Sequence, residues 1–517
     1  MKQLLYRGLQ AYTNPLAKRF YTALAEPQAV QERVLATLVS GISKTDYGLH
    51  HGIKTISDFK TKCPIITYED IADWMNRQRE SEKNVLVPGK VSFYEKTSGS
   101  TGPQKYIPYT KALRQSFTQM FLLWSNDLVK NVPELAKGKL YFSVSPNFDR
   151  ERITEQGVPV GLDDDADYLG GLWRTLLSPF LHLDPGLGKI TDPEAFKQAL
   201  AFSLIQCEDL AAISVWNPSF LVVIMHWIES HRDVVYEQLG AVLNQRQISA
   251  LQKDPIDWQQ LWPKLALISC WADGNAEPMA DKLKAQFPSI YVQGKGLLST
   301  EAPMTIPLVG VNGGVPLVEQ TYFEFLNDSG DLLTLDQLEL GQRYEIVISQ
   351  QAGLSRYRMG DEVEVVDRLM RTPTLKFIGR NNRTSDLVGE KLNEAFVGAV
   401  IKTLPLKNIG FRALMATRMP EDGYFLVLDQ APDHAAKVIE ELEQGLQQAY
   451  HYRHARALGQ LAQVGLVVIP DIENILSSYR IQRGKTLGDM KQNYLILEDE
   501  APDSVQALMT QRGVQAC

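Results

Sequence analysis

The chain has 517 residues, a formal net charge of -8 and an isoelectric point near 5.6. This acidic balance argues against a nucleic-acid partner, because phosphate contacts require a basic surface, and it favours a small-molecule ligand. Hydrophobic residues make up 44% and charged residues 22% of the chain, which is the mix of an ordinary folded protein and excludes a disordered one.

The N-terminal region is predicted to be helical, because apolar residues in AVQERVLATLVSGI recur at helical spacing. Polar or charged residues interrupt the first 24 positions every few residues, unlike the apolar core of a signal peptide. The longest apolar run, Phe220–Ile228, has nine residues, whereas a bilayer requires about 20. We therefore predict a cytoplasmic protein without a membrane span.

Short β-type runs alternate with helical stretches from Val91 to about Arg380. Examples are KLYFSV, LALISCW, SIYVQG, TYFEFL and YEIVIS, with ALRQSFTQMFLLW as a helix between them. Such alternation predicts an α/β core with a largely parallel sheet.

After Arg380 the pattern becomes a compact series, with a helix over 393–403, strands FRALMATR and YFLVLD, a helix over 434–450 and strand VGLVVI. We predict two domains, residues 1–380 and a smaller α+β domain of residues 381–517. The polar string GRNNRTSD between them is predicted to be a hinge, because it has few apolar residues to pack.

The string TSGSTGPQK, from Thr97 to Lys105, lies between the strand-like VSFYE and a helix expected to begin near Thr110. Glycines let backbone N–H groups approach an anion, hydroxyls donate hydrogen bonds, and a lysine supplies a positive charge, so this composition suits a phosphate-binding loop. It does not fit the GxxxxGK[ST] pattern of P-loop NTPases. A solvated connector is the alternative reading.

A second cluster is Ser269-Cys-Trp-Ala-Asp-Gly274 after an apolar strand, followed by YVQGKGLLSTE, which ends at Glu301. Each could be a strand that ends in a turn, and Glu301 could be a solvated loop acid. Magnesium prefers oxygen ligands and keeps waters, so one carboxylate together with nucleotide phosphates would suffice to hold it.

The third cluster decides the family: YFEF from Tyr322, then LELGQRYEIVISQQAGLSRYRMGDEVEVVD, then KFIGR ending at Arg380. Together the three clusters resemble the adenylate-forming superfamily of acyl-CoA ligases, adenylation domains and luciferases. Within it, YRMGD (357–361) resembles the ribose motif of the acyl-acid amido synthetases called the Gretchen Hagen family, as a bacterial-type member. Two departures are Pro103-Gln104 in the loop and Ser355, where many members have tyrosine, which predicts a different neighbouring surface.

The resemblance covers about residues 97 to 491 and implies a large N-terminal domain of β-sheets, flanking helices and a small β-barrel, with a mobile C-terminal domain. It implies ATP and Mg2+ as cofactors, with Glu301 as the metal ligand and a catalytic residue. It also implies catalytic roles for Lys391, which would reach the nucleotide phosphates, and for Lys491, which would enter the site for adenylation. The nucleotide-binding residues it implies are Thr97, Ser98, Gly99, Ser100, Thr101, Lys105, Ala272, Asp273, Thr300, Tyr322, Asp361 and Arg380.

Lys485 is a rival to Lys491, because Gly484-Lys485 is similar to the Gly-Lys of acyl-CoA ligase C-termini. Spacing favours Lys491, and either lysine could instead be a solvated surface charge.

The resemblance implies that a carboxylic acid becomes an acyl adenylate and is then transferred to an amine, with an amino acid as the family default. The alternatives are a ligase that forms a thioester on coenzyme A or a carrier protein, and a protein that keeps the fold without turnover. The segment GRNNRTSDLVGEKLNE lacks the hinge sequence that is usual in acyl-CoA ligases, which favours an amine over a thiol as the acyl acceptor. The acid is not identified, although Trp124, Phe142, Trp173 and Trp216 are candidate pocket walls, and we expect a monomer.

The remaining candidates have simpler structural readings. Four cysteines lie far apart without zinc spacing, so we expect reduced thiols, mostly in the core. The acidic residues Asp163, Asp164, Asp165 and Asp167 lack EF-hand spacing and are expected to form a solvated turn. His451 and His454 are expected to be exposed.

Overall fold

The computed structural model describes residues 2–81, 84–97, 105–143, 157–160, 180–182, 184, 186–190, 192–327, 329–380, 384–406, 409–418, 421–472, 475–476, 479 and 494–512. The chain divides into two compact units, and the main division lies between residues 381 and 382. Each unit is described by itself below.

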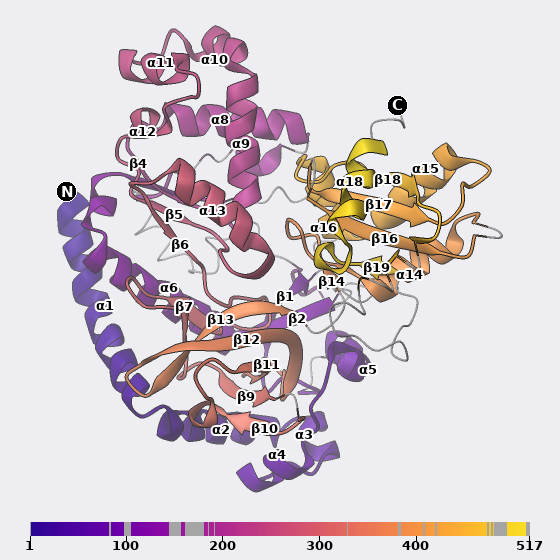
Figure 1. Ribbon diagram of the computed structural model, residues 1–517. Coiled ribbons are helices and arrows are strands. Elements are labelled where there is room, and N and C mark those ends of the chain that lie inside the picture. Colours follow the sequence, from indigo (N-terminus) through magenta and orange to yellow (C-terminus); the bar gives the residue numbers. More distant parts are fainter. Residues whose placement is uncertain are drawn as a thin grey trace. The chain divides into compact units, whose positions relative to one another are not determined.

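The N-terminal region of the first unit is helical, as predicted: α1 (Lys2–Ala25), α2 (Pro27–Ile42), α3 (Asp46–His50), α4 (Ile56–Lys62) and α5 (Tyr68–Glu80). Capping boxes start α4 and α5, where Thr55 pairs with Asp58 and Thr67 with Asp70. Helix α1 packs along α6 (Lys111–Asn131), as Figure 1 shows. Helix α6 begins where the sequence predicts it, with Thr110 as N-cap.

A parallel four-stranded sheet forms one layer of this unit, in the order β3-β4-β5-β6. The residues of β4 are all buried, as expected for a parallel strand covered on both faces. The bounds are β3 (Lys139–Phe142), β4 (Leu210–Ser214), β5 (Leu267–Ser269) and β6 (Tyr291–Gln293), and the helices of this region are α8 (Pro193–Gln206), α9 (Pro218–Ser230), α10 (Arg232–Leu239), α11 (Gln245–Gln252), α12 (Trp258–Leu261) and α13 (Glu277–Gln286).

The second large sheet of the unit is antiparallel, so the prediction of a largely parallel core is wrong for residues 305–380. Its order is β10-β9-β11-β12-β13-β8-β7. The successive strands that pair with each other, β7 with β8, β9 with β10, β11 with β12 and β12 with β13, are joined by connections too short for a crossover helix, which forces these pairs to run antiparallel. The bounds are β7 (Thr305–Pro307), β8 (Gly314–Pro316), β9 (Tyr322–Leu326), β10 (Leu332–Thr334), β11 (Arg343–Ser349), β12 (Tyr357–Leu369) and β13 (Thr372–Arg380).

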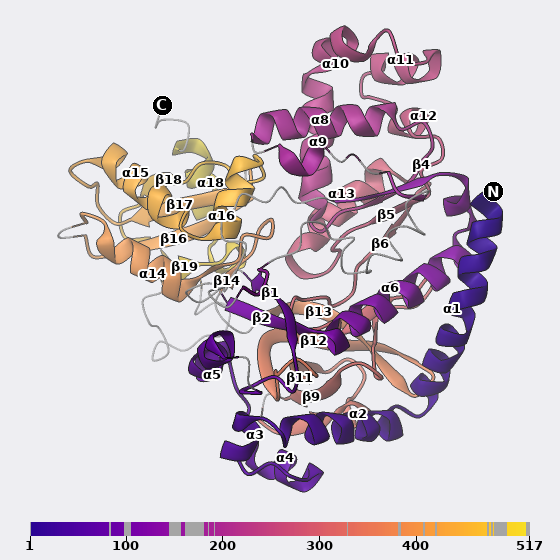
Figure 2. The ribbon, with the colours of Figure 1, turned by 180° about the vertical axis from the view of Figure 1, so that it is seen from behind.

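This sheet is curved and takes the place expected for the small β-barrel (Figure 2). Among the described strands its hydrogen bonding stays open, with β10 and β7 at its edges. The buried amide of Gln31 joins α2 to it, because Nε2 donates to the carbonyls of Val318 and Thr321 at 2.7 and 2.8 Å while Oε1 accepts from Phe323 N at 2.8 Å. A separate hairpin pairs β1 (Val91–Thr97) with β2 (Lys105–Thr110).

The second unit is an α+β domain, as predicted, with a mixed sheet in the order β18-β17-β16-β19. Alternate residues of β16 enter different cores: Leu414 and Ala416 pack with α14 and α15, whereas Ala413 and Met415 pack with α18. Helices therefore cover both faces of the sheet. The bounds are β14 (Thr384–Ser385), β15 (Leu392–Asn393), α14 (Glu394–Thr403), β16 (Arg412–Thr417), β17 (Gly423–Leu428), α15 (Ala435–Leu446), α16 (Tyr450–Ala457), β18 (Gly465–Val468), β19 (Leu495–Ile496) and α18 (Asp503–Arg512).

Cys63, Cys207 and Cys270 are buried free thiols. None of the described helices is both long and apolar enough to cross a membrane.

Candidate nucleotide site

The YRMGD motif begins strand β12 and contains a β-bulge. Glu345 and Val347 of β11 pair with Glu362 and Arg358 of β12, so three residues of β12, including Gly360 and Asp361, oppose a single residue of β11. Gly360 has φ +77°, a left-handed conformation that favours glycine. A bulge re-aims the side chains that follow it, which explains why this motif carries a glycine directly before its aspartate.

Strand pairing brings Asp361 opposite Arg380, the two residues that the resemblance assigns to the ribose. Asp361 is only 4% exposed. A carboxylate has two oxygens that can accept from two hydroxyls, so its chemistry suits a ribose. The β12–β13 hairpin brings these two residues together although they are far apart in the sequence.

The turn after β5 lies against the same end of β13. The Trp271 N–H donates to the Trp216 carbonyl at 2.8 Å, and Ala276 N donates to Asp273 O at 3.3 Å. Gly274 has φ +58°, and a Cβ there would come within 3.0 Å of the Phe377 ring. This close approach leaves no room for a larger residue, so the predicted adenine-binding turn at Ala272 and Asp273 is held beside the strand that carries Arg380.

The Thr300-Glu301 pair sits in a tight turn that is tied to strand β2 and to the residue after β11. Tyr109 of β2 donates its hydroxyl to the Thr300 carbonyl at 2.7 Å, and Gln350 Nε2 donates to the Glu301 carbonyl at 3.1 Å. Both bonds use backbone oxygens, so they position the segment without engaging the Glu301 carboxylate. No cluster of three or more His, Cys, Asp or Glu suited to a metal occurs within the described ranges. The role of Glu301 as a magnesium ligand stays a prediction.

The predicted phosphate loop connects paired strands. Thr97 and Lys105 are cross-strand partners at the end of the β1–β2 hairpin, and residues 98–104 between them, with Ser98, Gly99, Ser100 and Thr101, lie outside the described residues. Lys105 Nζ lies 3.9 Å from Glu69 Oε1 and 5.3 Å from the Tyr68 ring centre. The described contacts of this lysine thus include an ion pair and a cation–π contact with α5.

Tyr322 is part of the hydrophobic core, with its ring 6.4 Å from that of Phe59. Burial raises its pKa above the ordinary value, which keeps the phenol neutral. Its assigned role in nucleotide binding stays a prediction.

Arg356, which directly precedes the motif, is a residue that sequence reasoning missed. It has φ +50°, and its guanidinium donates to Glu324 through Nε at 3.0 Å and Nη2 at 2.7 Å. Nη1 also donates to the Cys63 and Lys60 carbonyls at 3.0 and 3.1 Å. This buried group joins β12 to β9 and to the end of α4. The neighbouring Ser355 is buried, so its difference from tyrosine alters the interior rather than the predicted surface.

Aromatic and polar side chains line the carboxyl ends of the parallel strands, where open α/β sheets bind ligands. Trp124 and Phe142 meet edge to face with ring centres 6.4 Å apart, and Trp216 and Trp271 are 6.1 Å apart. Lys295, which we did not single out from the sequence, donates to Ser214 Oγ at 2.8 Å and lies 4.9 Å from the Trp216 ring centre. Trp173 and the acidic residues 163–167 lie outside the described residues.

Lys391 belongs to the second unit, in a loop that β14 and β15 close as a short hairpin. It has φ +48°, and its charge adds to burial in lowering the pKa of His451 to about 3. His451 and His454 are half-buried, so the prediction that they are exposed is wrong. Helix α16, which carries both histidines, packs into the domain through Tyr452 and Ala455. Lys485 and Lys491 lie outside the described residues.

Comparison with known proteins identifies the family of the chain. Residues 16–254 match the model of the GH3 family N-terminal domain, and residues 314–380 match that of the GH3 family central domain, together more than half of the chain. The chain belongs to the GH3 family. Indole-3-acetic acid-amido synthetase GH3.3 of Arabidopsis thaliana is 24% identical over 535 residues, covering 89% of this chain and 88% of that protein.

Two solved structures share the fold of this GH3 protein. The acyl acid amido synthetase AtGH3.15, in complex with 2,4-DB, has a TM-score of 0.64 at 18% identity and covers 96% of both chains. A 2-hydroxyisobutyryl-CoA ligase in complex with 2-HIB-AMP and CoA has a TM-score of 0.55 at 15% identity, covering 95% of this chain and 92% of that one. These likenesses establish the adenylate-forming fold.

The Arg356–Glu324 pair generates the first prediction. Arg356→Met leaves the Glu324 carboxylate buried and unpaired, since the two side chains are only 10% and 5% exposed, and should cost about 3–5 kcal/mol. The matched control is Arg343→Met, which removes an exposed pair with Glu364 and should cost less than about 1 kcal/mol. Urea unfolding can be followed by tryptophan fluorescence, because all eight tryptophans precede residue 272. Equal losses for both variants would contradict the assignment.

Two buried carboxylates of the second unit generate the second prediction, on pH. Burial raises the pKa of Glu390 from 4.5 to about 7, so the folded state binds its proton more tightly and gains stability as pH falls from about 7 towards 4.5. For Glu443 burial is outweighed by hydrogen bonds from Gln447 and Arg456, which lower its pKa. The contribution of Glu443 to the free energy of unfolding is present above pH 4.5 and is lost as the pH falls through the lowered pKa of this carboxylate.

Calorimetric unfolding from pH 4 to pH 8 tests this opposition. The destabilisation by Glu390→Gln should shrink as pH rises, whereas the destabilisation by Glu443→Gln should grow. If the destabilisation by both variants changed with pH in the same direction, the two opposite pKa shifts would be contradicted.

Proposed function

We propose that this GH3 protein is an ATP-dependent acyl-acid amido synthetase, an acid–amino acid ligase that works through an acyl adenylate. The observation that carries the proposal is the bulge of YRMGD, which buries Asp361 opposite Arg380 beside the turn at Gly274. This arrangement suits a nucleoside in a family whose named relatives are amido synthetases.

In the first half-reaction a carboxylate oxygen of the acid attacks the α-phosphorus of ATP, the bond to pyrophosphate breaks, and acyl-AMP forms. Asp361 and Arg380 hold the ribose, Ala272 and Asp273 the adenine, and Ser98, Gly99, Ser100, Thr101 and Thr300 the phosphates. Glu301, together with the phosphates, would hold a magnesium ion, which when bound would supply positive charge. Lys391 and Lys491 neutralise the charge that develops on oxygen.

In the second half-reaction an amine attacks the acyl carbon, the bond to AMP breaks, and the amine loses a proton, giving an amide and free AMP. Adenylation is needed because a carboxylate is a poor electrophile, whereas AMP is a good leaving group. Rotation of the second unit about the residues near 381–386 exchanges the two half-reactions. An amino acid is the acceptor, by analogy with the named relatives, and the protein works as a cytoplasmic monomer.

Pyrophosphate release across a panel of carboxylic acids, with ATP and magnesium and with or without mixed amino acids, tests the function. We expect acid-dependent release and an amide product that requires an amino acid. Absence of turnover with every acid would favour a protein that keeps the fold without catalysis.

A thioester-forming ligase is the second candidate, because the 2-hydroxyisobutyryl-CoA ligase has the same fold. Free coenzyme A consumed in place of the amino acid would establish it, and unchanged coenzyme A beside amide formation would exclude it.

The third prediction concerns the lysine that enters the site for adenylation. Lys491→Ala should abolish acid-dependent pyrophosphate release while leaving the unfolding transition unchanged, because it removes a charge that acts on developing negative charge. Lys485→Ala is the matched control, six residues earlier in the same segment. Unchanged release in Lys491→Ala, with loss in Lys485→Ala, would reverse the assignment.

A further inference from the structure

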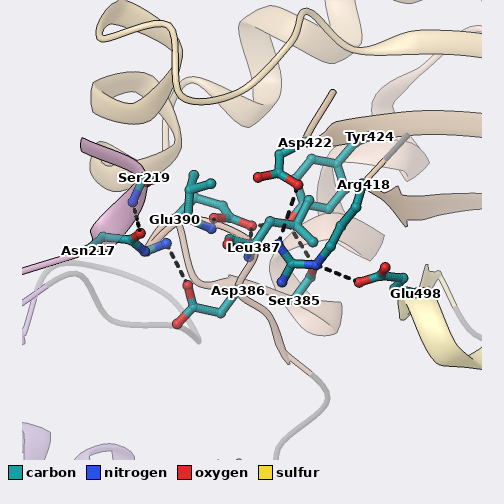
Figure 3. Close-up of polar contacts among 12 residues, drawn as sticks. Asn217, Ser219, Ser385, Asp386, Leu387, Glu390, Arg418, Asp422, Tyr424 and Glu498 are labelled. Atoms are coloured by element: carbon teal, nitrogen blue, oxygen red, sulfur yellow. Dashed lines mark hydrogen bonds and ion pairs between the residues drawn. The ribbon is translucent and has the colours of Figure 1, made fainter. Parts of the chain in front are cut away.

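A buried carboxylate, Glu390, organises the loop that carries Lys391. Glu390 is 1% exposed, and its two oxygens accept from the N–H groups of Leu387 and Val388, each at 2.8 Å. Gly389, with φ +104°, donates to Asp386 Oδ1 at 2.7 Å. The side chain thus turns back into its own loop and satisfies the backbone donors at the loop's start (Figure 3).

The same carboxylate ties the loop to the sheet of its domain. Tyr424 of β17 places its hydroxyl against a Glu390 oxygen and 2.7 Å from Ser385 Oγ. Arg418 Nη1 contacts the Leu387 carbonyl at 3.4 Å, while its Nε donates to Glu498 at 2.8 Å. Figure 3 shows Tyr424 and Arg418 converging on the loop from the sheet. The loop is therefore held at three places: at Ser385 of β14, at the Leu387 carbonyl and at the Glu390 carboxylate.

Lys391 follows immediately and has a strained backbone. A left-handed φ of +48° is unfavourable for a residue with a Cβ, and such conformations persist only where the surroundings determine them. The residue before Lys391 is Glu390, which is anchored through its carboxylate, and the residue after it, Leu392, pairs with Ser385 in the hairpin. The two anchors determine the backbone position of the lysine.

We propose that Glu390, together with Tyr424, is a positioning residue that sets the backbone of Lys391 for its contact with the nucleotide phosphates. The proposal rests on the proposed function, because the phosphate contact of Lys391 belongs to it. Glu390 itself touches no substrate and acts through the lysine. Functional groups lose effectiveness when the residues that hold them are removed, typically by about 10- to 100-fold.

A variant of Glu443 is the control that distinguishes a positioning role of Glu390 from a role in stability alone. It is a second buried glutamate of the same domain, and it also accepts from a tyrosine hydroxyl, that of Tyr452 at 2.9 Å, and from a backbone N–H, that of Val464 at 3.2 Å. Its further partner is Arg456 at 2.8 Å, and these hydrogen bonds join α15, α16 and the segment before β18 rather than the Lys391 loop. Glu443→Gln should lower the unfolding temperature without changing the kinetics.

The experiment measures acid-dependent ATP–pyrophosphate exchange, with kcat and the KM for ATP, in the full chain and in Glu390→Gln, Lys391→Ala, their double variant and Glu443→Gln. We expect Glu390→Gln to alter kcat and KM in the same direction as Lys391→Ala, with at least a 10-fold loss of kcat/KM. The double variant should be no worse than Lys391→Ala alone, because both changes remove one function. Tyr424→Phe, which removes only a hydroxyl, should give a smaller loss of the same kind and serves if Glu390→Gln does not fold.

The proposal is overturned if Glu390→Gln and Tyr424→Phe keep the kinetics of the unaltered chain, if the losses multiply in the double variant, or if Glu443→Gln loses activity equally. It also falls if Lys391→Ala is fully active. Failure of the proposed function gives a different result, because the unaltered chain would then show no exchange with any acid.

Discussion

Strand β12 must pair with β11 on one side and β13 on the other while carrying an extra length of chain beside β11, and this constraint organises the first unit. The left-handed Gly360 accommodates the excess, which rotates the strand locally and leaves Asp361 buried opposite Arg380. The Arg356–Glu324 pair fixes the entry of the strand, and the Phe377 ring against Gly274 fixes the adjacent turn. The candidate nucleotide site thus lies where one strand pairs with its two neighbours in different registers.

The second unit uses buried carboxylates for a similar purpose. Glu443 joins helices to the sheet with an arginine close by, so its charge is compensated. Within the described part of the chain, Glu390 accepts from the backbone N–H groups of Leu387 and Val388 and from the phenol of Tyr424, and burial near Asp386 raises its pKa. An uncompensated buried carboxylate is costly. The proposed positioning of Lys391 by Glu390 would account for that cost.

Much of the fold was predictable, since helical and strand periodicities are local. Helices α6 and α15 and strands β3, β5, β9 and β11 lie where apolar spacing predicts them. The antiparallel sheet was missed because a run such as YEIVIS reads alike in either direction, and neighbours alone decide between them. Arg356 was missed because a charged residue beside Tyr357 reads as solvated, whereas its partner Glu324 lies 32 positions away. The prediction that His451 and His454 of α16 are exposed was wrong for the same reason, because a histidine among charged residues reads as solvated.

The central claim is that the acid is activated as an adenylate, and oxygen transfer tests it most directly. With the carboxylate labelled by oxygen-18 and the amide product collected, one labelled oxygen should appear in AMP, because the acid's oxygen bonds to the α-phosphorus and stays there when the amine displaces AMP. Label in inorganic phosphate, with none in AMP, would show an acyl phosphate instead and would contradict the account.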